Sequence, residues 1–314
     1  MSTIICSCGD PQFANTGRPD CVIEMKALSF PILVPRFKAN GQRNTIDTQS
    51  ATIGSQILAK LQTGTPVLER FYPIPRAENV SFERSETVYE TAPSGRKVKI
   101  DGVGGVRTMR FELWSKEAVH QILRELKKIG CTDVDVYLVD VAGNLWGIKD
   151  NPGDQFMRGY EMATETFDAF KEYATDTTTQ KIMLSFDLDN AECEENSYAI
   201  TPGELGYKAT TLTGLISASQ VAIELTNVQM QTTVSTGFGS AVTLGKVKGL
   251  TLANFIVTGS VSGAVAISGV TETADGVYAL DHLDPAVAPG ETITIQVGNA
   301  TGYDVSNGSF VATL

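Results

Sequence analysis

Carboxylates and thiols are the side chains of this chain that could do chemistry, because histidine is scarce. The chain has 314 residues, five cysteines and two histidines, His120 and His282. Histidine is the usual general base near neutral pH and the commonest metal ligand. We expect His120 on the polar side of a helix, and neither histidine lies near a Ser or Cys motif typical of a triad. We therefore predict that the chain is not an enzyme and uses no cofactor.

Two groups of residues have the composition of metal ligands, but neither has the required spacing. The acidic residues at 187–195 lack the Gly and the alternating oxygen ligands of a calcium loop. The thiols of Cys6, Cys8 and Cys21 come without a nearby histidine or fourth cysteine, whereas structural zinc takes four ligands. We predict no metal site, although a second chain could complete a zinc site. The acidic set is Asp187, Asp189, Glu192, Glu194 and Glu195.

Phosphate-binding patterns fail as well. Residues 102–105 lack the third Gly of a dinucleotide fingerprint, and Lys246 is followed by Val247 and not by Ser or Thr. The formal net charge of -11 disfavours general binding to duplex nucleic acid, which depends on clustered Lys and Arg. The amino terminus does not resemble a secretion signal, and no apolar run of about 20 residues predicts a membrane span. We expect a soluble protein that is made in the cytoplasm and contacts no membrane.

Charge density divides the chain into two regions that meet near residue 208. Residues 209–314 contain two basic and seven acidic residues, whereas the first 208 residues contain 23 basic and 29 acidic residues. We therefore predict an assembly domain at 1–208, which begins with an extended arm, and a second domain at 209–314. The second region is rich in Thr and Gly, which suits short strands and tight turns.

The first region predicts a mainly β, α+β domain: an antiparallel sandwich or barrel with one packed helix. An amphipathic helix is expected at 115–130, and a small helix or helical turn at 52–61. Residues 22–37 contain Pro31 and Pro35, which favour an edge strand or short extended pieces. A turn at 93–95 joins the first two predicted strands. The strands are expected at 83–90, 97–101, 106–113, 134–141, 164–173 and 180–188.

The second region predicts a β-sandwich, because short apolar runs recur every 8 to 12 residues or so between turn signals. The segments NFIVTG (254–259), GVYAL (276–280) and GETITI (290–295) resemble bacterial immunoglobulin-like domains. The resemblance covers about 100 residues and implies a fold that hosts many unrelated functions.

Three aromatic residues are candidate anchors of a subunit interface: Phe71, Tyr72 and Trp146. Large aromatic side chains dominate buried contacts between chains. Ordinary packing in the core of the domain is the alternative for each of them.

Several segments of the first 195 residues resemble multicopy virion proteins of tailed phages. They are ILVPRFKANGQRNTID (32–47), RFYPIP (70–75), VYLVD (136–140), GNLWG (143–147) and QKIMLSFD (180–187). A sheet-and-helix domain followed by an immunoglobulin-like module is similar to the arrangement in tail tube proteins. That resemblance implies stacked, usually hexameric rings around a DNA channel, decorated outside by the module.

The resemblance implies a protein located in the virion whose partners are its own copies and other virion proteins, with DNA only as passing cargo. Acidic character suits a channel, because like charge prevents phosphates from adhering. A neck, tail-barrel ring or capsid-decorating role stays open. An alternative of another class is an adhesin whose C-terminal module binds host-surface glycan, although aromatic residues are sparse there.

Overall fold

The structure is a computed structural model that is mainly β, as the sequence predicts. It describes residues 23–86, 88–99, 105–114, 120–129, 132–151, 153–189, 192, 194–225, 229–236, 245–281, 290–298, 300–306 and 308–311. Cys6, Cys8, Cys21 and His282 lie outside these ranges.

The chain divides into two compact units. The boundary falls between Gly214 and Leu215, slightly after the predicted residue 208. The short segment Gln62–Pro66 groups with the C-terminal unit. Each unit has its own hydrophobic core, as expected of a domain.

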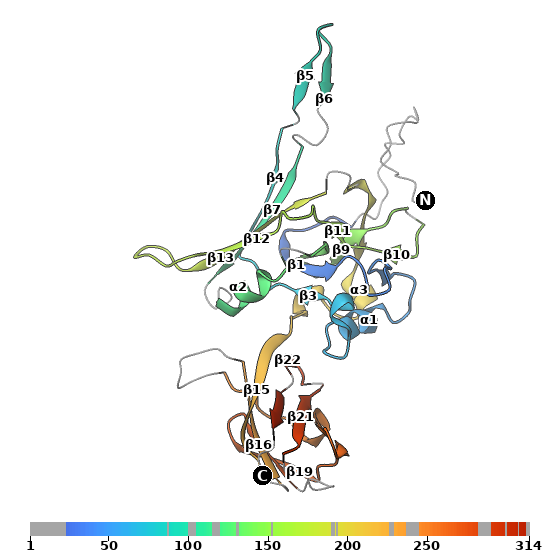
Figure 1. Ribbon diagram of the computed structural model, residues 1–314. Helices are drawn as coiled ribbons and strands as arrows, with labels where there is room; N and C mark the ends of the chain where they lie inside the picture. Colours follow the sequence, from blue (N-terminus) through green and yellow to red (C-terminus); the bar gives the residue numbers. More distant parts are fainter. Residues whose placement is uncertain are drawn as a thin grey trace. The chain divides into compact units, whose positions relative to one another are not determined.

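The first unit is built around a central sheet with strand order β14-β9-β8-β1-β3, in which β11 also pairs with β8 (Figure 1). Every residue of β8 is buried, because both faces of this sheet are covered. This is why most residues at 134–140 are apolar and why apolar and polar residues do not alternate along the strand. The central strands are β1 (Leu28–Pro35), β3 (Tyr72–Pro73), β8 (Val134–Asp140), β9 (Leu145–Ile148), β11 (Tyr160–Glu161) and β14 (Ser197–Ile200).

The prediction that residues 22–37 form an edge strand or short pieces was wrong for β1. This strand lies inside the central sheet, between β8 and β3. Strand β3 pairs only with Ile32 and Leu33, so Pro31 and Pro35 both lie outside the β1–β3 register. A strand with so short a partner tolerates proline, because few of its N–H groups are needed on that side.

An outer sheet with strand order β12-β13-β7-β4 covers one face of the central sheet. Burial alternates strictly along β7 and β13, so one face of the outer sheet joins the core and the other faces away. Strands β12 and β13, which correspond to the strands predicted at 164–173 and 180–188, pair antiparallel, as the predicted antiparallel sheet requires. Its strands are β4 (Asn79–Arg84), β7 (Arg107–Trp114), β12 (Asp168–Glu172) and β13 (Lys181–Leu188).

Helices pack against both faces of the central sheet of the first unit. The described part of the predicted helix, α2 (His120–Leu126), contributes Leu126 to the core between the two sheets. The opposite face of the central sheet is covered by α1 (Ile53–Lys60) and α3 (Pro202–Leu205), through Ile53, Ile57 and Leu205. Helix α3 has no counterpart among the predicted elements. It is short and starts with a capping box at Thr201 and Glu204.

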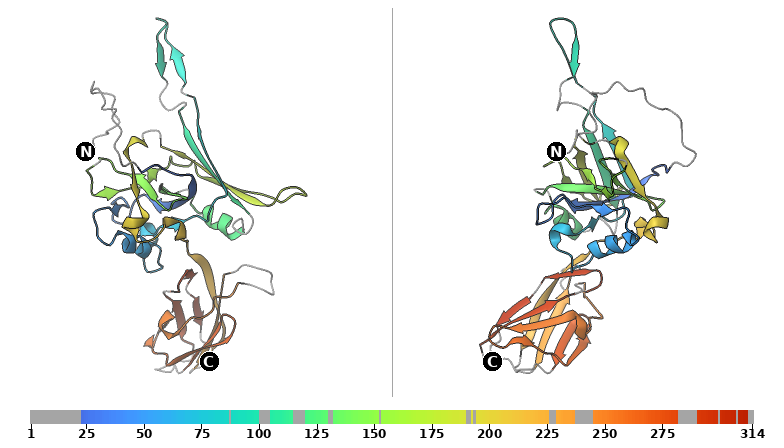
Figure 2. Two further views of the ribbon diagram at one scale, coloured as in Figure 1. Left: turned by 180° about the vertical axis from the view of Figure 1, so that it is seen from behind. Right: turned by 90° about the vertical axis from the view of Figure 1, so that its right-hand side faces the viewer.

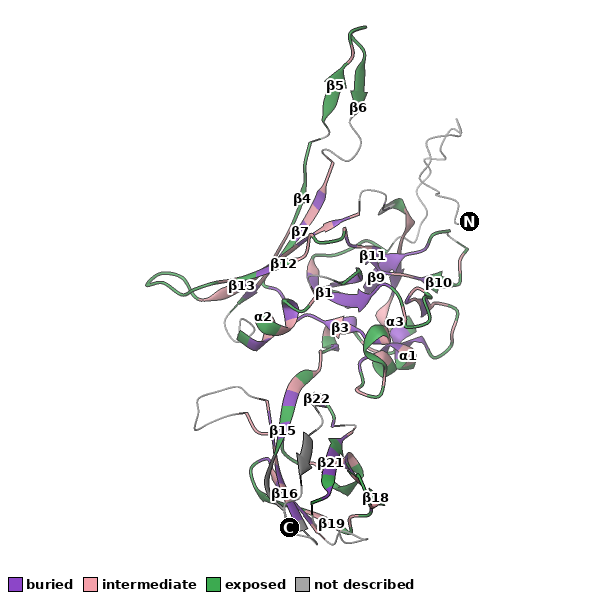
Figure 3. Ribbon diagram, viewed as in Figure 1, coloured by how far each residue is buried: buried purple, intermediate pink, exposed green. Residues whose placement is uncertain are grey.

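A two-stranded ribbon, β5 (Tyr89–Thr91) and β6 (Lys97–Lys99), pairs with no other described strand. The predicted turn at Pro93-Ser94-Gly95 joins its strands. Figure 2 shows this ribbon from two further sides, and the burial colours of Figure 3 mark most of its described residues as exposed. A second small pair joins β2 (Ile46–Asp47) and β10 (Phe156–Met157). Short 3₁₀ helices lie at Val67–Glu69, Glu194–Asn196, Ala209–Thr211 and Leu252–Asn254.

The turn between β8 and β9 requires glycine at Gly143, whose φ is +94°. A Cβ there would lie 2.8 Å from Cβ of Lys208. We expect Gly143→Ala to lower the free energy of unfolding by about 2 kcal/mol or more, because backbone strain and a steric clash add. Gly95→Ala is the matched control, since Gly95 has φ +80° but no atom within 4 Å of such a Cβ. Equal losses in urea unfolding for both variants would contradict the clash.

The second unit is a sandwich of two sheets, with orders β19-β20-β16-β15-β22 and β18-β17-β21-β23. Tyr278, Ile293 and Ile295 are fully buried between them. The predicted β-sandwich is therefore confirmed at the level of its two-sheet architecture. Its strands are β15 (Ile216–Leu225), β16 (Gln229–Ser235), β17 (Phe255–Gly259), β18 (Gly263–Val265), β19 (Gly269–Ala274), β20 (Val277–Asp281), β21 (Thr292–Val297), β22 (Tyr303–Ser306) and β23 (Gly308–Val311).

Candidate functional site

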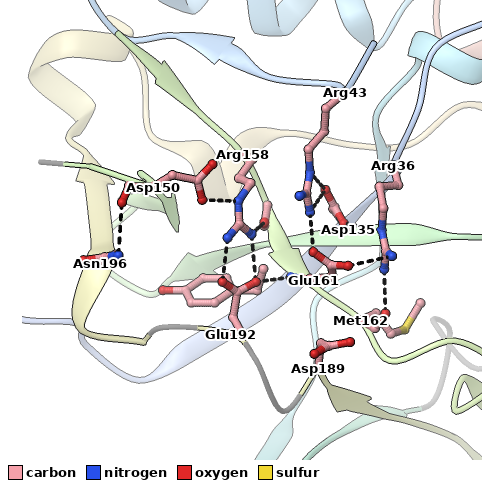
Figure 4. Close-up of polar contacts among 12 residues, drawn as sticks. Arg36, Arg43, Asp135, Asp150, Arg158, Glu161, Met162, Asp189, Glu192 and Asn196 are labelled. Carbon is pink, nitrogen blue, oxygen red and sulfur yellow. Dashed lines mark hydrogen bonds and ion pairs between the residues drawn. The ribbon is translucent and has the colours of Figure 1, made fainter. Parts of the chain in front are cut away.

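A polar cluster in the first unit joins two arginines to two carboxylates (Figure 4). Arg36 Nε lies 3.0 Å from Asp135 Oδ1, and Arg43 lies 2.9 Å from Asp135 Oδ2. Both guanidinium groups also contact Glu161, at 2.7 and 2.9 Å. Arg36 and Arg43 follow β1, Asp135 lies in β8 and Glu161 in β11. The cluster therefore ties together strands that are distant in the sequence.

A second arginine cluster lies beside the first. Arg158 makes two hydrogen bonds to the carboxylate of Glu192, both 2.8 Å long, and its Nε donates to Asp150 at 2.8 Å. Glu192 Oε2 also accepts from the backbone N–H of Glu161, which links the two clusters. Such two-point Arg–carboxylate pairs fix geometry as well as charge.

These clusters suit structural support better than catalysis. The oxygens of Asp135 and Glu161 already accept hydrogen bonds from guanidinium groups, so neither carboxylate is placed to take a proton from a substrate. Sequence reasoning missed Asp135 and Glu161, and it named Glu192 only as a member of the acidic set at 187–195. The available signal was an Asp inside the apolar run 134–139, because a carboxylate in a strand covered on both faces needs a buried partner.

Burial raises the pKa of Asp135 to about 6. The guanidinium groups of Arg43 and Arg36 act in the opposite direction, because they favour the charged carboxylate, but burial is the larger effect. Aspartate in an unfolded chain has a pKa of about 3.9, so between these values the folded chain binds more protons than the unfolded chain. The Asp135 contribution therefore raises stability as pH falls from about 6 to 4, and that gain is lost as pH rises through 6. We expect the wild-type chain to gain about 2–3 kcal/mol relative to Asp135→Asn over this window.

Urea unfolding of both proteins at pH 7.5 and pH 4.5 tests this pH dependence. Asp135→Asn removes the titrating group and keeps the side-chain size. An equal stability difference at the two pH values would rule out a raised pKa of Asp135.

Two of the acidic residues at 187–195, Asp187 and Glu192, accept hydrogen bonds from neighbouring side chains. Asp187 Oδ1 accepts from the Thr108 hydroxyl at 2.5 Å, and Glu192 pairs with Arg158. Across the described ranges, no three His, Cys, Asp or Glu side chains gather as a metal site would require. His120 is exposed, with Nε2 3.1 Å from Nζ of Lys171.

The three candidate interface residues have different surroundings in the structure. Phe71 is buried and packs on Tyr137, with ring centroids 5.4 Å apart. Tyr72 is half-buried in β3, and its hydroxyl donates to the Val67 carbonyl. Phe71 therefore has an intramolecular packing role, and an interface role for Phe71 and Tyr72 stays a prediction.

Trp146 is buried in β9, on the side of the central sheet that meets the outer sheet. Its Nε1 donates to Asp140 Oδ2 at 3.0 Å. Burial opposes ionisation of Asp140, but hydrogen bonds from Asn144 and Trp146 hold its pKa below the ordinary value. Trp146 thus helps to fix the β8–β9 turn, and its role as an interface anchor also stays a prediction.

An apolar pocket of about 320 Å³ lies in the first unit. Its lining includes one hydrogen-bonded polar pair, the Tyr160 hydroxyl and Ser197 Oγ at 2.8 Å. The pocket therefore suits an apolar side chain better than a charged substrate. It is lined by Met25, Leu28, Phe82, Met109, Leu138, Tyr160, Leu188 and Ser197.

The face of the outer sheet that points away from the core is the best candidate for an assembly surface. Its strand register places Phe170, Met183 and Glu112 in one row, and Glu172, Lys181 and Trp114 in the next. Phe170 and Trp114 are 43% and 39% exposed. The indole Nε1 of Trp114 donates to Glu112 Oε2 at 2.9 Å, and Lys181 Nζ lies 5.9 Å from its ring centroid, so one side of this aromatic pair is already bordered by charged groups. Seven charged residues share this face, five acidic and two basic: Glu83, Arg110, Glu112, Asp168, Glu172, Lys181 and Asp187.

No known family model matches the chain, and no curated protein is significantly similar to it. In the part of the chain that the structure describes, no helix is both long enough and apolar enough to span a membrane. The fold and its surfaces therefore define the class: a mainly β protein of two units whose first unit carries an exposed ribbon.

Proposed function

We propose that the chain is a self-assembling structural subunit of a phage virion, with the major tail tube subunit as its specific role. The outer sheet carries this proposal. Within the described residues, β4 and β12 each pair with one strand only and form the two edges of that sheet. Edge strands expose backbone groups that a strand of another chain can pair with. Pairing of β12 with β4 of the next copy is heterologous, and a heterologous contact closes into a ring or continues as a filament.

The charge and the second unit agree with this role. A net charge of -11 suits a conduit for DNA, because phosphates would not adhere to it. The C-terminal sandwich has a core of its own and is suited to be an appended module. The resemblance of residues 32–47, 70–75, 136–140, 143–147 and 180–187 to virion proteins supports a location in the virion.

Electron microscopy of the purified chain and of virions tests the function. We expect rings or stacked tubes, and labelling of the tail by an antibody raised against residues 209–314. Labelling of the neck or capsid instead would show that the chain is a neck or capsid-decorating protein. A chain that stays monomeric at all concentrations and is absent from virions would falsify the proposal.

A further inference from the structure

The β5–β6 ribbon lacks a core of its own. All its described side chains from Val88 to Val98 are exposed except Ala92, which is half-buried. Tyr89 is 57% exposed, and Val98 is 47% exposed. An isolated two-stranded hairpin is marginally stable in water, and exposed apolar side chains add to that cost. The ribbon therefore gains stability when a surface of another molecule covers it.

The charge of the ribbon indicates which surface that is. Residues 88–99 contain one acid, Glu90, and three bases, Arg96, Lys97 and Lys99, within a chain of net charge -11. Strand register places Tyr89 and Thr91 on the same face as Lys97. This face combines an aromatic side chain with positive charge, and its natural partner is an acidic surface that also carries exposed aromatic residues.

The away-facing side of the outer sheet has these properties. Its seven charged residues give a net charge of -3, and Phe170 and Trp114 provide apolar contact area. Asp168 and Glu172 lie exposed along the edge strand β12. Aromatic side chains surrounded by charged residues are typical of protein interfaces.

We propose that the ribbon of one copy docks on the away-facing side of the outer sheet of a second copy of this chain. Tyr89 meets the apolar area of Phe170 and Trp114, and Lys97 meets Asp168 and Glu172. This inference rests on the proposed function, which supplies many copies of the chain. Beyond the proposed function, the inference names the two surfaces, the ribbon and the away-facing side of the outer sheet, that bind each other.

Charge reversal in the full-length chain tests the docking. We expect Lys97→Glu with Lys99→Glu to raise the concentration at half-assembly by about tenfold or more in sedimentation velocity. Asp168→Lys with Glu172→Lys is expected to have the same effect. Salt should weaken assembly of the unmodified chain, because the pairs are exposed. Lys127→Glu with Lys128→Glu, at an exposed site after α2, makes the same charge change and should leave assembly unchanged.

An equal mixture of the two reversed chains provides the decisive measurement. Each reversed ribbon then finds a reversed sheet on the other chain, so we expect assembly within about threefold of the unmodified protein. Thermal unfolding confirms that each variant is folded. A mixture that assembles no better than its components overturns the docking, as do rings that neither reversal weakens; in the latter case the proposed function stands. An unmodified chain that never assembles overturns both.

Discussion

Asp135→Ala is expected to lower the free energy of unfolding of the first unit by about 3–5 kcal/mol at pH 7.5. The side chain of Asp135 is 1% exposed and pairs with Arg36 and Arg43. Removing it leaves two guanidinium groups in a low-dielectric region with Glu161 as their one remaining carboxylate partner in the cluster. The truncation removes the hydrogen-bond acceptor of Arg36 Nε and Arg43 Nε and leaves a cavity, and buried donors left without an acceptor are costly.

Tryptophan fluorescence during urea unfolding measures this loss in the correct unit. Both tryptophans of the chain, Trp114 and Trp146, belong to the first unit. Asp176→Ala is the matched control, since Asp176 is exposed in the β12–β13 turn, and we expect a change within about 0.5 kcal/mol. Similar losses for the two variants would show that the Asp135 pairs contribute no more than a surface charge.

Phe71→Ala is expected to cost about 3–5 kcal/mol, the usual loss for a buried phenylalanine. The ring is 2% exposed and packs on Tyr137 in the core shared with α1. The cavity left behind lies under the central sheet, where covered faces allow little relaxation. Urea unfolding of the monomeric chain at low concentration measures this loss without a contribution from assembly.

Tyr89→Ala is the matched aromatic truncation on the ribbon. Tyr89 is exposed, so its removal should change the unfolding free energy by less than about 0.5 kcal/mol. Sedimentation velocity should show weaker assembly for Tyr89→Ala. The reverse pattern, with a folded and stable Phe71→Ala chain that no longer assembles, would assign the interface role to Phe71 and contradict the packing role.

Local patterns predicted much of the secondary structure. The strand predicted at 180–188 corresponds to β13, and the turn predicted at 93–95 joins β5 and β6. The spacing of apolar residues at 52–61 predicted α1. These features depend on neighbours within a few residues, which is why sequence periodicity reports them.

Strand order and the polar clusters depended on distant contacts. Pro31 and Pro35 pointed to an edge strand, yet the short partner β3 lets β1 lie inside the sheet. Arg36 and Asp135 are 99 residues apart, and no local pattern pairs them. Phe71 and Trp146 were candidate anchors because aromatic type alone does not tell a core from an interface.

By itself, the sequence determined a mainly β protein with two regions of different charge density and without the spacing of known catalytic or metal motifs. Composition and periodicity suffice for these conclusions, because they follow from burial and from the repeat of each element. Only the tertiary structure decided which aromatic residues are buried, which carboxylates share arginines, and which ribbon and sheet face stay exposed. Those properties arise from contacts between residues far apart in the chain, where the burial of one face depends on what another segment covers.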